Sequence, residues 1–345
     1  MIQRDAALRV ARLAGEILEK SGTRSRVENG YTRVDPITIA ESAGIDVMAR
    51  PLDKLLGAFL REERVGILLN NQRPSGMFHM TCAHELGHFY LGHLTSTDEH
   101  LDYRSDASEA ELEADQFAYA LMSPLWLIAR ILKAQGWGWN SMRDPFIVYQ
   151  LSLRLGLSYS ATLWSLVRLR KLDSNVAKIL VKHQPAEIKL GLIPQGVSLE
   201  ANQDVWCVGP RDKDFILEPR PNDRIVANLP SHAAAGYLWS INEAQQEGYT
   251  LAPLTIDSQR PSTESEDDVL IGGTPTIHYE LKFTPSKDAS MPIIPTKVAL
   301  QETQPWLPAD AKVATKFSLQ TKFEILSEGL SSTSRERLIQ RSHLS

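Results

Sequence analysis

Cysteine is scarce in this chain, which has two, Cys82 and Cys207, among 345 residues. Two thiols so far apart in the sequence exclude a disulfide scaffold and fit a reducing compartment. The sequence also lacks the run of about 20 apolar residues that is needed to cross a bilayer. Residues 1–8 do not contain the long apolar core of a signal peptide. We therefore expect a cytoplasmic protein that makes no contact with a membrane.

Positive charge is not in excess either, because the net charge at pH 7 is −5. Without a basic field over the chain, we expect no direct binding of nucleic acid. Two short helices predicted at residues 145–157 and 158–170 have the layout of a helix-turn-helix reader. They carry a modest basic cluster, made of Arg154, Arg168, Arg170 and Lys171. Since no further basic arm accompanies this cluster, we favour packing over DNA binding.

The most informative stretch is His84-Glu85-Leu86-Gly87-His88, an H-E-x-x-H signature in a segment with few helix breakers. Two histidines four residues apart differ by about 40° around a helix, so both imidazoles leave the same face. That arrangement suits two ligands of a zinc ion. Glu85 would lie beside the metal, where it can accept a proton from an activated water molecule. The pattern predicts a zinc peptidase, with a chance match as the alternative.

A catalytic zinc takes three protein ligands and leaves a fourth position open. The third ligand is expected within residues 108–124, a segment of helix formers that has acid in its first turn and stops at a proline. Glu113 is the best candidate, because the apolar residues after it indicate a packed side. Glu109 and Glu111 fit a solvated acidic face better. Asp115 is the second choice as ligand, or a partner for a ring nitrogen of a ligand histidine.

The other histidines near the motif have weaker claims. His93 follows His88 by five residues, about 140° around a helix, and is therefore poorly placed as a ligand. His79 and His100 belong to no motif and are expected to be structural or solvated. Residues 95–107 are polar and acidic, and we favour a solvated connection over a mobile loop above the site.

Several motifs together carry a family resemblance. His84-Glu85-Leu86-Gly87-His88, then the segments 113–118 (EADQFA) and 121–124 (LMSP), resemble the ImmA/IrrE metallopeptidases. Residues 35–45 and 149–158 are similar to that family's entry helix and small helical cap, so the resemblance covers about residues 30–172. It implies a zinc-dependent endopeptidase that cuts a helix-turn-helix repressor in bacterial stress or mobile-element regulation. It also implies one zinc per chain, held by His84, His88 and Glu113, with Glu85 as general base.

Local patterns around the motif predict a small α+β domain. Residues 5–21 repeat apolar side chains at helical spacing, and Asp35-Pro36 opens a second helix as N-cap and first residue. Three short strands are expected at residues 45–49, 57–60 and 66–70. A zinc peptidase commonly holds its substrate extended along the edge of such a sheet.

From about residue 204 the pattern changes to short strands. Residues 276–283 alternate apolar and polar side chains, as in a half-buried strand. Six or seven such strands within about 120 residues suggest a β-sandwich. The expected strands are 215–218, 223–229, 237–241, 250–254, 276–283, 298–302 and 315–323.

This second half resembles chagasin-type cysteine-peptidase inhibitors in three loops. Ser231 to Trp239 is similar to their first binding loop, Gly272 to Pro275 to their Gly-rich second loop, and Gln304 to Trp306 to their third. The resemblance implies an immunoglobulin-like sandwich with these loops at one end. The family's Asn-Pro-Thr-Thr and the Arg of its third loop are replaced here, the latter by Gln304. We therefore rank general protein binding above inhibition of a papain-like enzyme, and expect Trp239 in the core.

Taken together, the sequence predicts an α+β protein, a mainly helical zincin-like peptidase domain with a small sheet followed by an all-β immunoglobulin-like sandwich. The expected segments are residues 1–172 for the peptidase, 173–203 for a connector, 204–326 for the sandwich and 327–345 for a disordered tail. Two alternatives stay open. The chain could be a regulatory binding protein with a silent metal site, or an inhibitor acting through its C-terminal domain.

Overall fold

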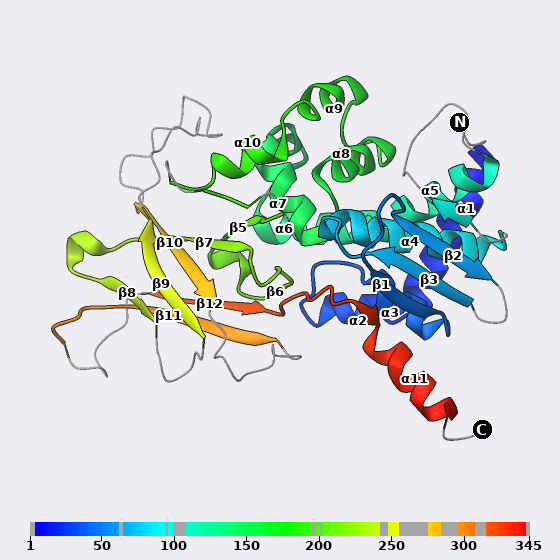
Figure 1. Cartoon of the computed structure of the whole chain (residues 1–345). Coiled ribbons are helices and arrows are strands. Elements are labelled where there is room, and N and C mark those ends of the chain that lie inside the picture. The colour runs from blue at the N-terminus through cyan, green and yellow to red at the C-terminus, as the bar shows by residue number, and fades with distance from the viewer. Residues whose placement is uncertain are drawn as a thin grey trace. The chain divides into compact units, whose positions relative to one another are not determined.

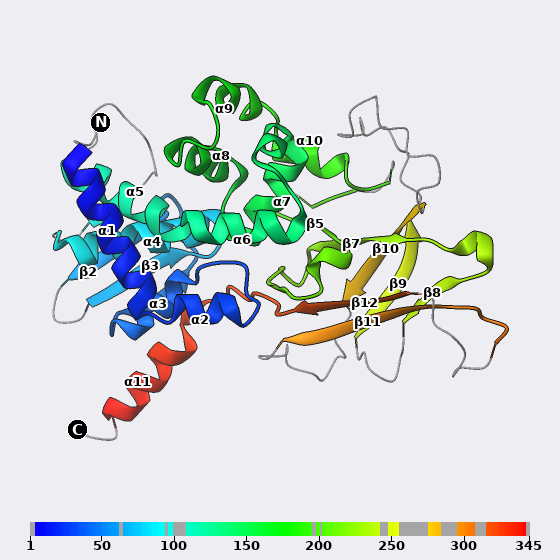
Figure 2. The same cartoon turned by 180° about the vertical axis from the view of Figure 1, so that it is seen from behind.

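The computed structural model of the chain shows two compact units (Figures 1 and 2). One unit comprises Met1–Lys133, Gly138–Val181 and Leu326–Ser345, and the other comprises Ala134–Trp137 and Lys182–Ile325. The predicted α+β class is confirmed, since the first unit is mainly helical and the second is rich in strands. The structure describes residues 4–61, 65–93, 96–98, 108–194, 198–200, 202–241, 248–254, 275–283, 295–307 and 315–342.

Helices in the first unit begin where the sequence supplies capping groups. Asp35 accepts the backbone N–H of Ile37 at 3.1 Å and that of Thr38 at 3.2 Å, so the predicted start of α3 is confirmed. The helices are α1 Arg4–Lys20, α2 Thr23–Glu28, α3 Pro36–Ser42, α4 Ser75–Leu91, α5 Glu109–Met122, α6 Leu125–Gln135, α7 Pro145–Leu155, α8 Tyr159–Arg168 and α9 Ser174–Leu180, with α11 Ser332–Ser342 further along the chain.

One helical stretch of the first unit, Glu109–Gln135, is long and apolar enough to cross a membrane by length and composition alone. Within its most apolar window, 56% of the residues are buried inside the protein. A core helix has the same properties, and this stretch supplies Phe117, Leu121 and Ile128 to the interior, all at 0% exposure.

A five-stranded sheet supports the helices of the first unit, in the order β13-β1-β3-β2-β4. Its strands are β1 Asp46–Arg50, β2 Gly57–Arg61, β3 Val65–Asn70, β4 Ser96–Asp98 and β13 Gly329–Leu330. The three strands predicted from the sequence are β1, β2 and β3. Helix α4 lies so close to β2 that a Cβ added at Gly57 of β2 would be 2.5 Å from Cγ2 of Thr81 of α4. Only glycine permits this approach.

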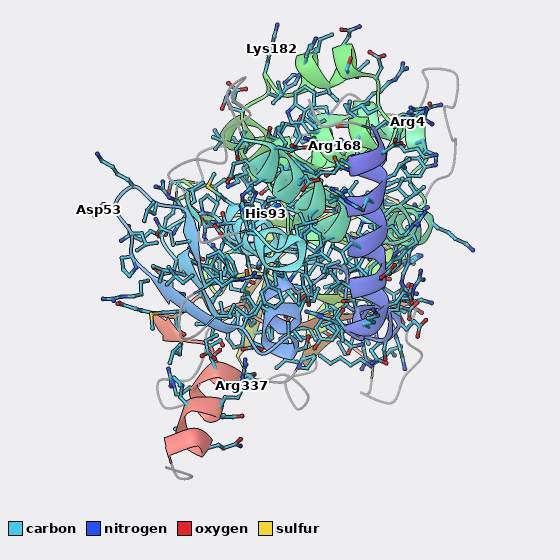
Figure 3. The ribbon with its side chains drawn as sticks, turned by 90° about the vertical axis from the view of Figure 1, so that its right-hand side faces the viewer. Arg4, Asp53, His93, Arg168, Lys182 and Arg337 are labelled. Carbon is cyan, nitrogen blue, oxygen red and sulfur yellow. The ribbon has the colours of Figure 1, made fainter. Side chains whose placement is uncertain are left out.

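The segment predicted as a disordered tail, residues 327–345, is instead a strand and a helix as far as Ser342. Strand β13 pairs antiparallel with β1, placing Leu330 opposite Met48. Helix α11 follows, and its Ser334 Oγ accepts the backbone N–H of Val47 at 3.1 Å. Arg337, labelled in Figure 3, donates to the carbonyl of Ile45 at 3.1 Å. The composition was misleading because polar contacts to the sheet, rather than an apolar stripe, hold this segment.

The second unit contains two four-stranded sheets, with strand orders β5-β7-β10-β9 and β6-β12-β11-β8. Tyr249 of β9 shares a 2.5 Å hydrogen bond with Thr321 of β12 and so joins them. Strand β5 was missed in the sequence, and helix α10 lies in the predicted connector. The elements are α10 Pro185–Leu190, β5 Val205–Val208, β6 Ile216–Leu217, β7 Arg224–Pro230, β8 Leu238–Ile241, β9 Tyr249–Leu254, β10 Thr276–Phe283, β11 Thr296–Thr303 and β12 Thr315–Thr321.

Candidate metal centre

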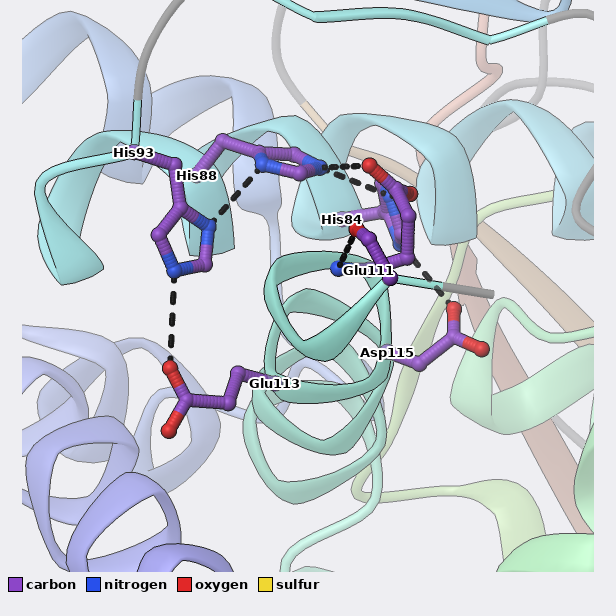
Figure 4. A network of polar contacts seen from close by, with 7 residues as sticks. His84, His88, His93, Glu111, Glu113 and Asp115 are labelled. Carbon is purple, nitrogen blue, oxygen red and sulfur yellow. Dashed lines mark hydrogen bonds and ion pairs between the residues drawn. The ribbon is translucent and has the colours of Figure 1, made fainter. Parts of the chain in front are cut away.

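The two histidines of the motif lie together on the buried helix α4. Their Nε2 atoms are 3.1 Å apart, and the ring centroids are 4.9 Å apart (Figure 4). Both rings are buried, at 2% exposure for His84 and 1% for His88. The sequence-based prediction that both imidazoles leave one face of the helix is therefore confirmed.

Helix α5 crosses α4 at a glycine of the motif. A Cβ added at Gly87 would lie 2.9 Å from Cα of Ala114 and 3.1 Å from its carbonyl oxygen. Such a contact with backbone atoms leaves no room for a side chain, so glycine is what allows α5 to approach. Ser108 caps α5 by accepting the N–H of Glu111 at 3.3 Å. The first turn of α5 therefore lies over the histidine pair.

The acid that completes the group is Glu111, not the predicted Glu113. Its Oε2 lies 3.1 Å from Nε2 of His84, and its Oε1 lies 3.5 Å from Nε2 of His88. Among the described residues, these three donors form the group able to hold a metal ion, with their ligand atoms within 4.8 Å of one another.

Glu113 lies outside the three-donor group because of helix geometry. Glu113 follows Glu111 by two residues, about 200° around the helix axis. Its side chain therefore points away from α5 on the face opposite to that of Glu111. There its Oε1 accepts a 2.5 Å hydrogen bond from Arg9 of α1. The sequence did hold a usable signal, since Glu111 and Asp115 are four residues apart and share a face. Glu111 is therefore not on the solvated face predicted for it, because its carboxylate faces the two histidines.

Asp115 lies outside the donor group and contacts a ring nitrogen of His84, the second of the two predictions for it. Its Oδ1 lies 3.0 Å from Nδ1 of His84, on the far side of the ring from Glu111. A carboxylate there accepts a hydrogen bond from the Nδ1–H of His84 and so leaves the Nε2 lone pair directed at the group. This is the orientation that a histidine ligand requires.

The spacing of the three donors fits a tetrahedral ion such as zinc. Ligand bonds of about 2.0–2.2 Å at tetrahedral angles place neighbouring donor atoms about 3.3–3.5 Å apart. The observed separations are 3.1 Å between the two histidine nitrogens, 3.1 Å from His84 to Glu111 and 3.5 Å from His88 to Glu111. Two imidazoles and one carboxylate also form a known catalytic zinc set. The residues therefore fit the ion that the motif predicts.

Glu85, the predicted general base, is buried on the same helix. It is 0% exposed. Its Oε1 lies 3.2 Å from where a Cβ on Gly57 would be, so its carboxylate is directed toward β2. Glycine at this position of β2 leaves space beside that carboxylate. Its assignment as the base stays a prediction from the motif.

The remaining sequence candidates lie outside the three-donor group. His93 contacts His88 and Glu113 (Figure 4). Burial, and then the charge of His88, lowers the pKa of His93. His79 is a structural residue, as predicted, because its ring contacts Arg33 and the carbonyl of Gly156 at 3.0 Å. His100 is outside the described residues, as is most of the predicted loop 95–107, of which the structure describes 96–98 as β4.

In the second unit, two of the three predicted binding loops lie against each other. Gln304 donates to the carbonyl of Ala235 at 3.0 Å, and Gly236 adopts a φ of 83° against the ring of Trp306. The backbone N–H and the ring of His232 both contact Glu302 at 2.6 Å. Trp239 is buried, as expected. Residues 272–274 of the second loop are outside the described residues.

These features give the first unit a candidate metal site, and the comparison with family models points to a peptidase. Residues 40–163 match the family model of the IrrE N-terminal-like domain, a peptidase family, and this range includes all three donors. No curated protein matches the chain. The motif-based resemblance to this family is thereby confirmed.

Two solved structures are similar to part of the chain. One is the cysteine protease inhibitor EhICP2 from Entamoeba histolytica, at 15% identity and a TM-score of 0.25, covering 36% of this chain and 100% of that one. The other is Amebosin, at 17% identity and a TM-score of 0.23, covering 35% of this chain and 98% of that one. The first of these is a cysteine protease inhibitor, the class that the C-terminal loops resemble.

Proposed function

We propose that the first unit is a zinc-dependent endopeptidase that hydrolyses a peptide bond in a protein substrate. The observation that carries the proposal is the tetrahedral spacing of His84, His88 and Glu111 at the crossing of α4 and α5. Two buried imidazoles and one partly exposed carboxylate would hold a zinc ion through three bonds and leave one position for water. The match to a peptidase family supports the same conclusion.

Each residue of the centre has a distinct task in this reaction. His84, His88 and Glu111 would hold the ion, and Asp115 keeps the His84 ring in the required tautomer. When bound, zinc would lower the pKa of water and polarise the scissile carbonyl. The carboxylate of Glu85 accepts a proton from the attacking water and passes this proton to the leaving amine. Glu85 is fully buried on α4, the helix that carries both histidines, and this placement supports the role.

For the substrate, we propose a helix-turn-helix transcriptional repressor, cut in the cytoplasm during bacterial stress or mobile-element regulation. The support is the family resemblance. Strand β4 forms the edge of the sheet beside β2, the strand next to Glu85, and backbone groups on this edge can pair with an extended peptide. We therefore expect the substrate to bind as an added strand there.

The test uses a variant that keeps the metal and loses the base. Glu85→Gln should retain about one zinc per chain by elemental analysis, and should fail to cleave a repressor encoded beside this gene. The size of Gln matches Glu, so the variant should fold. Full cleavage by Glu85→Gln would remove Glu85 from the mechanism. A wild-type protein that binds zinc and cleaves no repressor would favour the regulatory alternative with a silent site.

A second function, protein binding through the C-terminal loops, is favoured by exposed apolar side chains. Trp306 is 67% exposed and Leu307 is 43% exposed at the third loop. Large apolar residues grouped at a loop commonly mark a protein contact. Titrating the full chain against a papain-like enzyme separates inhibition from general recruitment. Inhibition that Trp306→Ala abolishes would establish the narrower role, and no inhibition would leave recruitment.

A further inference from the structure

His93 follows the site helix and contacts a ligand rather than the centre itself. Its Nδ1 lies 3.0 Å from Nδ1 of His88, whose Nε2 faces His84 and Glu111 (Figure 4). We propose that His93, supported by Glu113 and Arg9, is a positioning residue that holds His88 in the tautomer and orientation needed to bind the metal ion. The inference rests on the proposed zinc centre and assigns roles to three residues outside the donor group.

The end of α4 brings His93 to this position. Gly92 has a φ of 76° and ends the helix after Leu91. The chain then turns back, and the N–H of His93 donates to the carbonyl of His88 at 2.9 Å. On a continuing helix, five residues would separate the two side chains by about 140°. Because the chain turns back at this left-handed glycine, the rings of His88 and His93 meet edge to face, with centroids 5.0 Å apart.

The contacts permit one proton arrangement that satisfies every group. If His88 binds a cation through the lone pair on Nε2, its Nδ1 carries the proton and must donate it. Nδ1 of His93 is the acceptor, so the proton of that ring is on Nε2. That Nε2 lies 3.5 Å from Oε2 of Glu113, a carboxylate that attracts it. The order His88, His93, Glu113 therefore selects the tautomer of the ligand.

Arg9 completes the series from a different helix. Its guanidinium lies 2.5 Å from Oε1 of Glu113 and keeps that carboxylate directed at His93. The side chain of Arg9 is 68% exposed, whereas that of Glu113 is 11% exposed. An exposed ion pair contributes little on its own, so Arg9 should have the smallest effect of the three. Its contribution is to fix the geometry of the buried carboxylate.

The two histidine ligands thus have different supports. Asp115 contacts Nδ1 of His84 directly at 3.0 Å. At Nδ1 of His88 the contact is instead the imidazole of His93. The carboxylate of Glu113 then contacts His93 and not His88. Groups that orient metal ligands typically change metal affinity by about 10–100-fold when removed. We expect an effect in this range for His93.

The test measures zinc affinity of the full chain by competition with a chromophoric chelator. His93→Leu should weaken zinc binding by about 10–100-fold. His93→Gln, whose amide oxygen can accept the Nδ1 proton of His88, should recover part of that loss. Glu113→Gln should weaken binding less than His93→Leu, while the exposed Glu109→Gln serves as its control. Arg9→Ala should have the smallest effect and is compared with Arg12→Ala, an exposed neighbour on α1.

A second measurement distinguishes positioning from a purely structural role. Long-range proton–nitrogen spectra of zinc-loaded, histidine-labelled protein should show the Nδ1–H tautomer for His88 and the Nε2–H tautomer for His93. Wild-type affinity in His93→Leu would overturn the inference, even if the metal-free protein were less stable. The opposite tautomer would do the same. Zinc binding without cleavage would end only the peptidase proposal, whereas a wild-type chain that binds no zinc would end both.

Discussion

The two units use histidine and carboxylate in opposite ways. In one pair of the first unit the histidine is buried and the acid is more accessible, with side-chain exposures of 3% for His84 and 32% for Glu111. In the second unit the acid is buried and the histidine is accessible, at 0% for Glu302 and 41% for His232. Both pairs are in contact, at 3.1 Å and 2.6 Å. The same two residue types therefore serve different purposes.

The difference lies in where the unshared electron pairs point. Around His84 and His88, two ring nitrogens and a carboxylate oxygen converge on one place, and acceptors that converge in this way create a need for a cation. Around Glu302, the backbone N–H and the ring of His232 both point at the acid and satisfy it. The first arrangement suits a metal site, and the second fixes a loop.

Glu111→Gln should have the largest effect, because it removes a charged donor from the converging group. We expect zinc affinity to fall by more than about 100-fold, beyond the range typical of residues that only orient ligands. Chelator competition measures the loss, and cleavage should disappear with it. A larger loss of zinc in Glu113→Gln than in Glu111→Gln would mean that Glu113 is the third ligand and Glu111 is not.

Gly87→Ala should disturb the same centre through packing alone. The added methyl group would meet backbone atoms of Ala114 at 2.9 Å and 3.1 Å, so α5 must shift and carry Glu111 with it. We expect a loss of about 1–3 kcal/mol in unfolding free energy, together with weaker zinc binding.

The matched control for that substitution is Gly15→Ala on α1, where a Cβ meets nothing within 4 Å. Alanine should stabilise this helix by about 0.5–1 kcal/mol. Chemical denaturation followed by circular dichroism measures both variants. Equal behaviour of the two would show that the close approach of α4 and α5 is not required.

His232→Ala tests the other side of the comparison. It removes one of the two donors to the buried Glu302 and should destabilise the second unit by about 1–2 kcal/mol. Zinc affinity should stay unchanged, because this pair belongs to a different unit. A thermal scan of the full chain with and without zinc measures both quantities. Altered metal binding would contradict the separation of the two roles.

The last expected effect is the pH dependence of Asp223 in the second unit. Burial, and then the charge of Asp204, raises the pKa of Asp223 to about 6. Its folded pKa is above the unfolded value, so this stabilisation is complete below about pH 4 and is lost as the pH rises through 6.

Between pH 5 and 7 we expect a loss of about 1 kcal/mol from this group. The indole N–H of Trp206, which donates to Asp223 at 3.0 Å, reports the titration by nuclear magnetic resonance. The midpoint of the Asp223 titration should move to lower pH in Asp204→Asn, because the charge that raises its pKa is removed. A midpoint near pH 4 in the wild type would contradict the raised pKa.

Much of the fold could be predicted because local signals agreed with it. Asp35 before Pro36 located α3, and strict alternation located β10. The tail could not be predicted, because β13 exists through backbone pairing with Met48 and Ala49, far away in the sequence. Residues 327–342 show no apolar repeat that would reveal such a partner.

In the site, spacing along one helix was informative and contact between helices was not. His84 and His88 followed from a spacing of four residues. The third donor depended on which face of α5 meets α4, and the pair Glu111 and Asp115 indicates that face better than the apolar residues near Glu113 do. His93 lies outside the donor group, as predicted, but not because of its angle around a helix, since Gly92 ends the helix one residue before it.

The path of the chain has a consequence for biosynthesis. The sheet of the first unit includes β13, which follows the whole of the second unit in sequence. Translation proceeds from the N-terminus, so a nascent chain contains His84, His88 and Glu111 well before Leu330 can pair with Met48. The five-stranded sheet therefore stays one strand short on the ribosome until the whole second unit has been synthesised.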